Sequence, residues 1–263
     1  MKRSLLLLMT IIVVVSCGKK NEIEYSTASA EDHLTSQNFF GDVFRTVYSV
    51  TSDIDGLRAD NCIDEMEADT TAGALSLWIN YGQDECISPD GRVRNGEIYC
   101  EFTDRWSVPG ASVIVQPGFY SVDGYTIGGS VTITNLGENE FGREEFELKV
   151  FNGEIDSPDN GGSISWNCDM VLEWKEGQVS NFVEDDVFYW TGTANGVNRN
   201  GSEFEAEIQE PIEHDIVCRW FKSGMVEVTP SGREIREVDL GLGDCNELAT
   251  VTVEAQTYTV SFP

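Results

Sequence analysis

SISWNCDMVLEWKE, residues 163–176, decides the fold class of this chain. Within it every second side chain is apolar, at Ile164, Trp166, Cys168, Met170, Leu172 and Trp174. A period of two is typical of a strand with one buried face and one wetted face. The same alternation recurs at residues 145–150 and 203–208, where charged residues, all acidic except Lys149, occupy the wetted positions. The sequence therefore predicts antiparallel sheet.

Turn signals separate these alternating segments. The cleanest is Asp123-Gly124, which predicts a two-residue hairpin loop between residues 111–122 and 125–135. About a dozen strands are expected after residue 56, and no strand–helix–strand spacing indicates a parallel sheet. The predicted fold class is all-β, with antiparallel sheets in a sandwich or in an elongated two-unit arrangement.

One amphipathic helix is predicted ahead of the sheet, over residues 29–51. Its apolar side chains recur at helical spacing, at Phe40, Val43, Phe44, Val47 and Tyr48. Ser29 is a candidate N-cap, with Asp32 as its capping-box partner. A single apolar stripe favours core packing, so we expect this helix to lie across a sheet.

The first residues predict export and lipidation. Lys2-Arg3 precedes an apolar run, residues 5–15, that is too short to span a bilayer. The run continues into Val14-Val15-Ser16-Cys17-Gly18, which resembles a bacterial lipobox. That resemblance implies a thioether-linked diacylglyceryl group on Cys17, cleavage before it and acylation of the new amino terminus. The alternative is an ordinary signal peptide with an incidental cysteine.

The residues after Cys17 indicate which membrane holds the protein and which face of that membrane it occupies. Gly18 stands where an aspartate would signal retention in the inner membrane, so an outer-membrane lipoprotein is expected. Residues 19–24, KKNEIE, are similar to the lysine-then-acid export tag of surface lipoproteins in the Bacteroidota. Asn21 departs from that tag, and the cell surface is favoured over the periplasmic face.

Charge excludes one class of partner. The chain has 46 acidic and 17 basic residues, a net charge of −29. Nucleic acid is therefore not expected as a partner, because binding phosphates requires a basic surface. The two histidines, His33 and His214, lie far apart in sequence, which argues against a multi-histidine metal site. Each is interpreted as a surface histidine.

The expected organisation has four parts. Residues 1–16 are the signal peptide, 17–28 a lipidated tether, 29–56 the helix and its connection, and 57–263 the β domain. A weak internal repeat places a cysteine four residues after a glycine twice, at Cys86 and Cys245. That repeat raises the alternative of two related β units, residues 57–175 and 176–263.

Six cysteines remain once Cys17 is assigned to lipid, and an even number in an exported protein indicates disulfides. A hairpin closed by the two-residue loop Ser231-Gly232 places Cys218 opposite Cys245. The alternative, a three-residue loop with Gly232 as a bulge, shifts the register by one residue, which a further bulge near Gly241 or Gly243 would absorb. The internal repeat then pairs Cys62 with Cys86. Cys100 and Cys168 are left as the third pair.

Catalytic motifs are not found in the sequence: no nucleophile elbow, zinc-protease helix or phosphate loop occurs. Glycoside hydrolysis needs only two acids, and Glu184-Asp185-Asp186 beside Phe188-Tyr189-Trp190 is the most suggestive cluster. A charged turn before a strand is the simpler interpretation.

Binding features are sparse. No cofactor is expected, with calcium as the remaining candidate at the acidic turns Asp53, Asp55, Gly56, Asp60 and Asp156, Asp159, Asn160. Neither turn has the ligand spacing of an EF-hand. Trp106, which precedes the loop at residues 107–110, is the tryptophan whose setting indicates a sugar-stacking platform at a rim.

Four segments resemble a family of secreted Bacteroidota lipoproteins. They are PDGRVRNGEI (89–98), NRNG (198–201), CRWFKSG (218–224) and GDCN (243–246), and the similarity extends over residues 60–262. The family has no assigned activity, so the resemblance implies location and β architecture but no catalytic residue. Cys100 and Cys168 stand where other residues are expected in relatives, which implies an additional pair in this chain.

The expected function is that of a non-enzymatic outer-membrane or cell-surface lipoprotein. It would be attached to the membrane by its lipid and would act as a binding or structural module for a glycan or protein ligand. The alternative is a glycan-active enzyme that uses two carboxylates.

Overall fold

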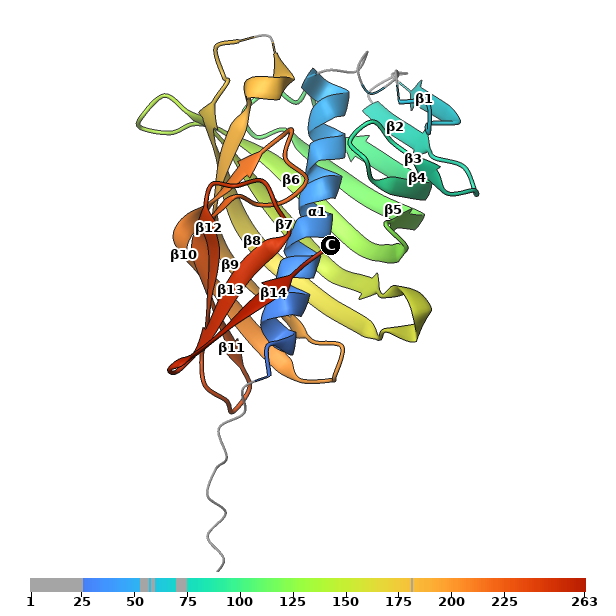
Figure 1. Cartoon of the computed structure of the whole chain (residues 1–263). Coiled ribbons are helices and arrows are strands. Elements are labelled where there is room, and N and C mark those ends of the chain that lie inside the picture. Colours follow the sequence, from blue (N-terminus) through green and yellow to red (C-terminus); the bar gives the residue numbers. More distant parts are fainter. Residues whose placement is uncertain (1–25, 53–56, 58–59, 70–74, 181) are drawn as a thin grey trace, which may run out of the picture.

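One long helix lies against one curled antiparallel sheet in the computed structural model (Figure 1). The structure describes residues 26–52, 57, 60–69, 75–180 and 182–263. The helix is α1 (Ala28–Ser52), and the described strands form a single 14-stranded sheet. Each strand pairs with its sequence neighbours, except that β2 pairs with β4 and the short β3 pairs only with β4. The all-β prediction with one N-terminal helix is confirmed.

The strands have the following bounds: β1 (Glu65–Asp69), β2 (Leu75–Asn80), β3 (Cys86–Ile87), β4 (Val93–Phe102), β5 (Ser112–Val122), β6 (Tyr125–Glu138), β7 (Glu144–Asp156), β8 (Ser163–Glu176), β9 (Val187–Val197), β10 (Glu203–Asp215), β11 (Ser223–Pro230), β12 (Arg236–Leu242), β13 (Leu248–Val253) and β14 (Gln256–Ser261).

Local sequence signals predict the sheet well. In β8, Trp166, Met170 and Leu172 are fully buried, as the alternation requires. Asp123 and Gly124 form the turn between β5 and β6, with φ angles of 53° and 82°. Positive φ at both residues is what a two-residue hairpin loop with the right-handed strand twist demands.

The helix is buried on every side, not along one stripe only. Its polar residues Thr35, Asn38 and Asp42 lie opposite the apolar stripe and are at most 4% exposed. The reason is the curl of the sheet, which places β5–β8 behind α1 and brings β13 and β14 to its front (Figure 1).

Among the described residues, no helix combines the length and the hydropathy that a membrane span requires.

The predicted capping pair is used for tertiary contacts instead. The helix begins one residue earlier than expected, and Thr27 accepts the first backbone hydrogen bonds and bonds Glu31 through its hydroxyl. Ser29 accepts a hydrogen bond from Asn198 at 2.8 Å. The Asp32 carboxylate accepts hydrogen bonds from Arg199, so it is not free to cap the helix.

The strands on either side of residue 175 share one core. β8 and β9 pair directly over eleven registered positions that end at Glu176 and Val187. The buried apolar side chains form one cluster that includes residues of α1 and of nearly every strand. The described residues thus form one curled sheet in which both expected β units take part.

Two of the predicted disulfides form. The Cα atoms of Cys62 and Cys86 are 5.5 Å apart, and those of Cys218 and Cys245 are 5.8 Å apart. The register behind the second prediction is wrong, however, because Val228 pairs with Arg236, one residue later than a Ser231-Gly232 loop requires. The bond forms because both cysteines lie in connections beyond the paired strands.

The third predicted disulfide is wrong: Cys100 and Cys168 are free and buried. Cys100 belongs to β4 and Cys168 to β8, and β5–β7 lie between them. At ~4.8 Å per strand, the two positions are about 19 Å apart along the sheet, whereas disulfide-bonded Cα atoms lie within ~7 Å.

Both thiols should therefore resist alkylation in the folded protein. Burial raises the pKa of Cys100 to about 12 and raises the pKa of Cys168 above its usual range. Thiolate is the reactive form, so we expect no carbamidomethyl group on either cysteine in native protein treated with iodoacetamide at pH 8. In denaturant without reductant, peptide mapping should find a carbamidomethyl group on both Cys100 and Cys168. Labelling of the native protein, or none after denaturation, would contradict the structure.

Candidate functional site

A groove of about 640 Å³ opens on the outer face of β2, β4 and β5, the face turned away from α1. Its lining consists of Asp64, Asn80, Gly82, Gln83, Asn95, Gly96, Glu97, Gly118 and Phe119. Ile79 and Ile98 alternate with these residues and are fully buried on the helix side. We call this feature the outer groove.

Irregular strand pairing shapes the outer groove. The register of β4 against β5 shifts between Asn95 and Glu97, so that Gly96 stands opposite both Phe119 and Tyr120. Gly96 has a φ of 83°, and a Cβ atom there would overlap the carbonyl oxygen of Phe119. Only glycine permits both the positive φ and this close approach.

Phe119 is the most unusual residue of the groove. Its side chain is 92% exposed and its φ is 50°. The other non-glycine residues with positive φ in the described ranges are Asp123, Asn152, Asp159, Asn160 and Glu254. A positive φ is a genuine outlier for a bulky residue and costs on the order of 1 kcal/mol. Burial of the ring does not offset that cost.

The polar groups of the groove differ in how they are hydrogen-bonded. The indole Nε1 of Trp78 donates to Oε2 of Glu97 at 2.8 Å, which fixes that carboxylate. Asn80 Oδ1 accepts a hydrogen bond from the Gly82 amide at 2.8 Å. The side-chain amides of Gln83 and Asn95 make no hydrogen bond to any residue that the structure describes. They are free to bind a solute.

A buried ion cluster lies on the helix side of the same strands. Oδ1 of Asp42, a fully buried carboxylate of α1, is 2.6 Å from Arg45 Nη2 and 2.7 Å from Arg94 Nη2. It is also 3.3 Å from Arg92 Nε. The hydroxyl of Tyr120 donates to Asp42 Oδ2 at 3.2 Å. Burial alone would raise the pKa of Asp42, but Arg94, Arg92 and Arg45 hold it well below its usual range.

The ion cluster and the outer groove are formed by adjacent residues of the same strands, β4 and β5. Asn95 lines the groove while its neighbour Arg94 bonds Asp42. Phe119 likewise faces outward while its neighbour Tyr120 is fully buried. Alternate residues of a strand point to opposite faces of a sheet, so the cluster fixes the chain that carries the groove.

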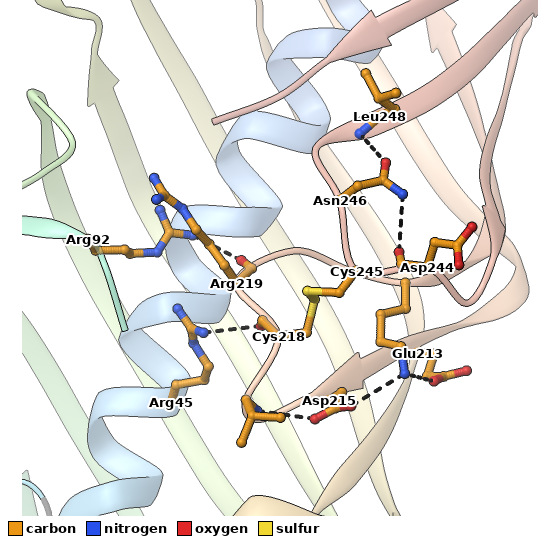
Figure 2. Close-up of a disulfide and its surroundings, with 12 residues drawn as sticks. Arg45, Arg92, Glu213, Asp215, Cys218, Arg219, Asp244, Cys245, Asn246 and Leu248 are labelled. Atoms are coloured by element: carbon orange, nitrogen blue, oxygen red, sulfur yellow. Dashed lines mark hydrogen bonds and ion pairs between the residues drawn. A yellow bond between two sulfur atoms is a disulfide. The ribbon is translucent and has the colours of Figure 1, made fainter. Parts of the chain in front are cut away.

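The cluster also attaches the connection between β10 and β11, residues 216–222, across α1. Arg45 Nη1 and Arg92 Nη2 donate to the carbonyl oxygens of Cys218 and Arg219, each at 3.1 Å (Figure 2). Arg92 and Arg219 both bind the carboxylate of Asp123 in the β5–β6 turn. The Cys218–Cys245 disulfide ties this connection to the one between β12 and β13 (Figure 2).

Trp106, the tryptophan that the sequence indicates as a stacking platform, is packed against the sheet on one side. Its ring is partly buried and stacks on Phe146, with centroids 4.9 Å apart and an angle of 12° between the planes. One face of the indole is therefore covered. Among the described phenylalanines Phe119 is the most exposed, ahead of Phe141, Phe182 and Phe151. No local sequence signal distinguishes it from the apolar residues around it.

The other candidate residues have structural roles or lie outside the described residues. Asp186 of the acidic cluster accepts hydrogen bonds from Tyr48 at 2.6 Å and Trp174 at 3.0 Å, which joins α1 to the sheet. His33 and His214 are buried and not on the surface, because the sheet and the 216–222 connection enclose them. Cys17 is among the residues that the structure does not describe.

The calcium candidates gain no support from the described residues. Asp53, Asp55 and Gly56 lie outside them, and Asp60 accepts a hydrogen bond from the Cys62 amide at 2.9 Å. In the second turn, Asp159 and Asn160 have positive φ angles, next to Asp156 at the end of β7. Within the described ranges, no three His, Cys, Asp or Glu side chains are grouped as a metal site requires.

Family models, curated proteins and solved structures were each compared with the chain, and none of them matches it.

Proposed function

We propose that the chain is a lipid-anchored binding protein of the outer membrane, facing the cell surface, and that the outer groove is its ligand site. The lipobox-like segment at Cys17 and the KKNEIE segment support the location. The observation that carries the binding role is Phe119, which is both exposed and backbone-strained. Strain of this kind clusters at ligand sites, because the fold gains nothing from it.

A glycan-active enzyme is the second candidate, since two carboxylates, Asp64 and Glu97, line the same groove. Glycosidases need two acids about 5 to 10 Å apart. If this candidate holds, the protein releases new reducing ends from an oligosaccharide, and Glu97→Gln abolishes the release. If binding alone is the function, the oligosaccharide is recovered intact.

Lipidation tests the proposed location. Cys17→Ser should move the protein from the membrane fraction to the soluble fraction, because several acyl chains on one residue supply firm anchoring. Mass spectrometry of the wild-type protein from membranes should find an acylated Cys17 at the amino terminus. Membrane retention of Cys17→Ser, or an unmodified amino terminus elsewhere, would contradict the proposal.

Substituting Phe119 with asparagine should stabilise the fold by about 1 kcal/mol, since asparagine tolerates positive φ and the lost ring makes no buried contact. Urea denaturation measures the difference. Phe151→Asn is the matched control, because Phe151 is 53% exposed but has an ordinary φ, so no gain is expected there. A loss of stability in Phe119→Asn would mean that the ring supports the fold, and would remove the observation on which the binding role rests.

A further inference from the structure

We infer that the ligand of the outer groove is a neutral carbohydrate chain, stacked on Phe119 and hydrogen-bonded to Gln83, Asn95 and Glu97. This inference rests on the proposed function, because it names the ligand class of the same site. Three properties of the groove carry it: an exposed aromatic ring, free amides beside a fixed carboxylate, and a lining without basic residues.

The aromatic ring suits one face of a sugar. A pyranose has an apolar face of C–H bonds, which packs well against the electron-rich face of an aromatic ring. Phe119 presents such a ring at 92% exposure, beside a groove floor that is otherwise polar. The bulge at Gly96 fixes the backbone that directs this side chain outward.

The polar groups suit sugar hydroxyls, each of which donates one hydrogen bond and accepts others. The amides of Gln83 and Asn95 both donate and accept, and neither is bonded within the described fold. The Glu97 carboxylate keeps acceptor sites after it binds the Trp78 indole through Oε2. Such groups match a polyhydroxylated ligand better than an apolar one.

The charge of the groove excludes anionic ligands. Its lining contains Asp64 and Glu97 but no lysine or arginine. Uronate polymers, sulfated glycans and phosphorylated compounds would meet two carboxylates without a counter-charge. The inference is therefore restricted to glycans without acidic groups.

A peptide ligand suits the site less well. An extended peptide gains affinity chiefly by pairing its backbone with a free strand edge. The outer groove lies on the face of β2, β4 and β5, and these strands already pair with one another. The groove therefore offers side chains and not unpaired backbone, which again favours a ligand recognised through hydroxyls.

Affinity electrophoresis in gels containing a polysaccharide tests the inference with the full mature protein. The neutral probes are β-glucan, mannan, galactan and arabinan, and the anionic probes are polygalacturonate and heparin. We expect retardation by at least one neutral probe and by neither anionic probe. Phe119→Asn should weaken the binding about tenfold, the scale of a lost aromatic contact, whereas Phe119→Tyr and Phe151→Asn should leave it within about twofold.

Three results would overturn the inference: no retardation by any neutral probe, equal retardation of wild type and Phe119→Asn, or stronger binding to the polyanions. The stability of Phe119→Asn separates this failure from failure of the proposed function. If that variant is more stable than wild type but no glycan binds, the groove remains a ligand site and the ligand class is wrong. If that variant is less stable, the proposed function itself fails.

Discussion

Asp42→Asn should lower the free energy of unfolding by about 4 kcal/mol, the largest effect that we expect from a single substitution. The carboxylate is fully buried and neutralises the guanidinium groups of Arg45, Arg92 and Arg94, whose side chains are at most 9% exposed. Removing one partner of a buried ion pair typically costs about 3 to 5 kcal/mol. In the variant Asp90 still pairs with Arg94 and Arg45, and Asp123 with Arg92, but three buried guanidinium groups then share two carboxylates.

Urea denaturation at pH 7 measures this loss, and failure of the variant to fold is the extreme form of the same result. Asp169→Asn is the control, because it makes the same chemical change in a side chain that is 59% exposed and 3.5 Å from Lys149. An exposed pair of this kind contributes less than about 1 kcal/mol. Equal losses in the two variants would show that the Asp42 cluster contributes no more than a surface ion pair.

Sequence reasoning had no means of finding this cluster. Arg45 lies in α1, Arg92 just before β4 and Arg94 within it, and Arg219 lies in the connection after β10. Nothing in the local pattern of any of these segments indicates the others. The cluster exists because the sheet curls around the helix, and the curl is a property of the whole sheet.

The sequence predicts local features well, such as which face of a strand is buried and where a hairpin turns. The alternation in residues 163–176 determines which face of β8 is buried, and the positive φ angles of Asp123 and Gly124 fix one hairpin. The prediction fails where burial depends on distant strands. Asp42 lies on the side of the helix opposite the apolar stripe, and it is buried because strands from both ends of the sheet enclose α1.

The candidate site shows the same limit. Phe119 and Tyr120 are adjacent aromatic residues, and simple alternation leaves open which of them faces outward. The bulge opposite Gly96 decides this, and it sends Tyr120 to Asp42 and Phe119 into solvent. Trp106 looked exposed from its neighbours in sequence, but Phe146, which covers it, is 40 positions away.

Acid should destabilise the protein well before its carboxylates titrate, because both histidines are buried. Burial lowers the pKa of His33 to about 4, and burial together with Arg45 lowers the pKa of His214 well below its usual value. His33 Nδ1 accepts a hydrogen bond from the indole of Trp166 at 3.3 Å, which a protonated nitrogen cannot do. Both side chains are therefore neutral in the fold at pH 7.

The direction of the effect follows from proton linkage. An unfolded histidine binds its proton near pH 6.5, so the unfolded chain takes up protons that the folded chain excludes. The stabilisation is fully present above pH 6.5 and is lost as the pH falls toward 4. Each histidine contributes a slope of about 1.4 kcal/mol per pH unit, so His33 alone accounts for about 3 kcal/mol between pH 6.5 and pH 4.

His33→Asn isolates this contribution, since the asparagine Oδ1 can still accept the Trp166 hydrogen bond but does not titrate. Urea denaturation at intervals between pH 6.5 and 4.5 should give a slope about 1.4 kcal/mol per pH unit shallower than that of wild type. The slopes of the two proteins are compared because every other titrating group contributes equally to both. Burial raises the pKa values of Asp32 and Asp186, which opposes the wild-type decline, but both carboxylates are present in the two proteins. Equal slopes would mean that His33 is protonated in the folded state, and that the helix is less enclosed than the structure shows.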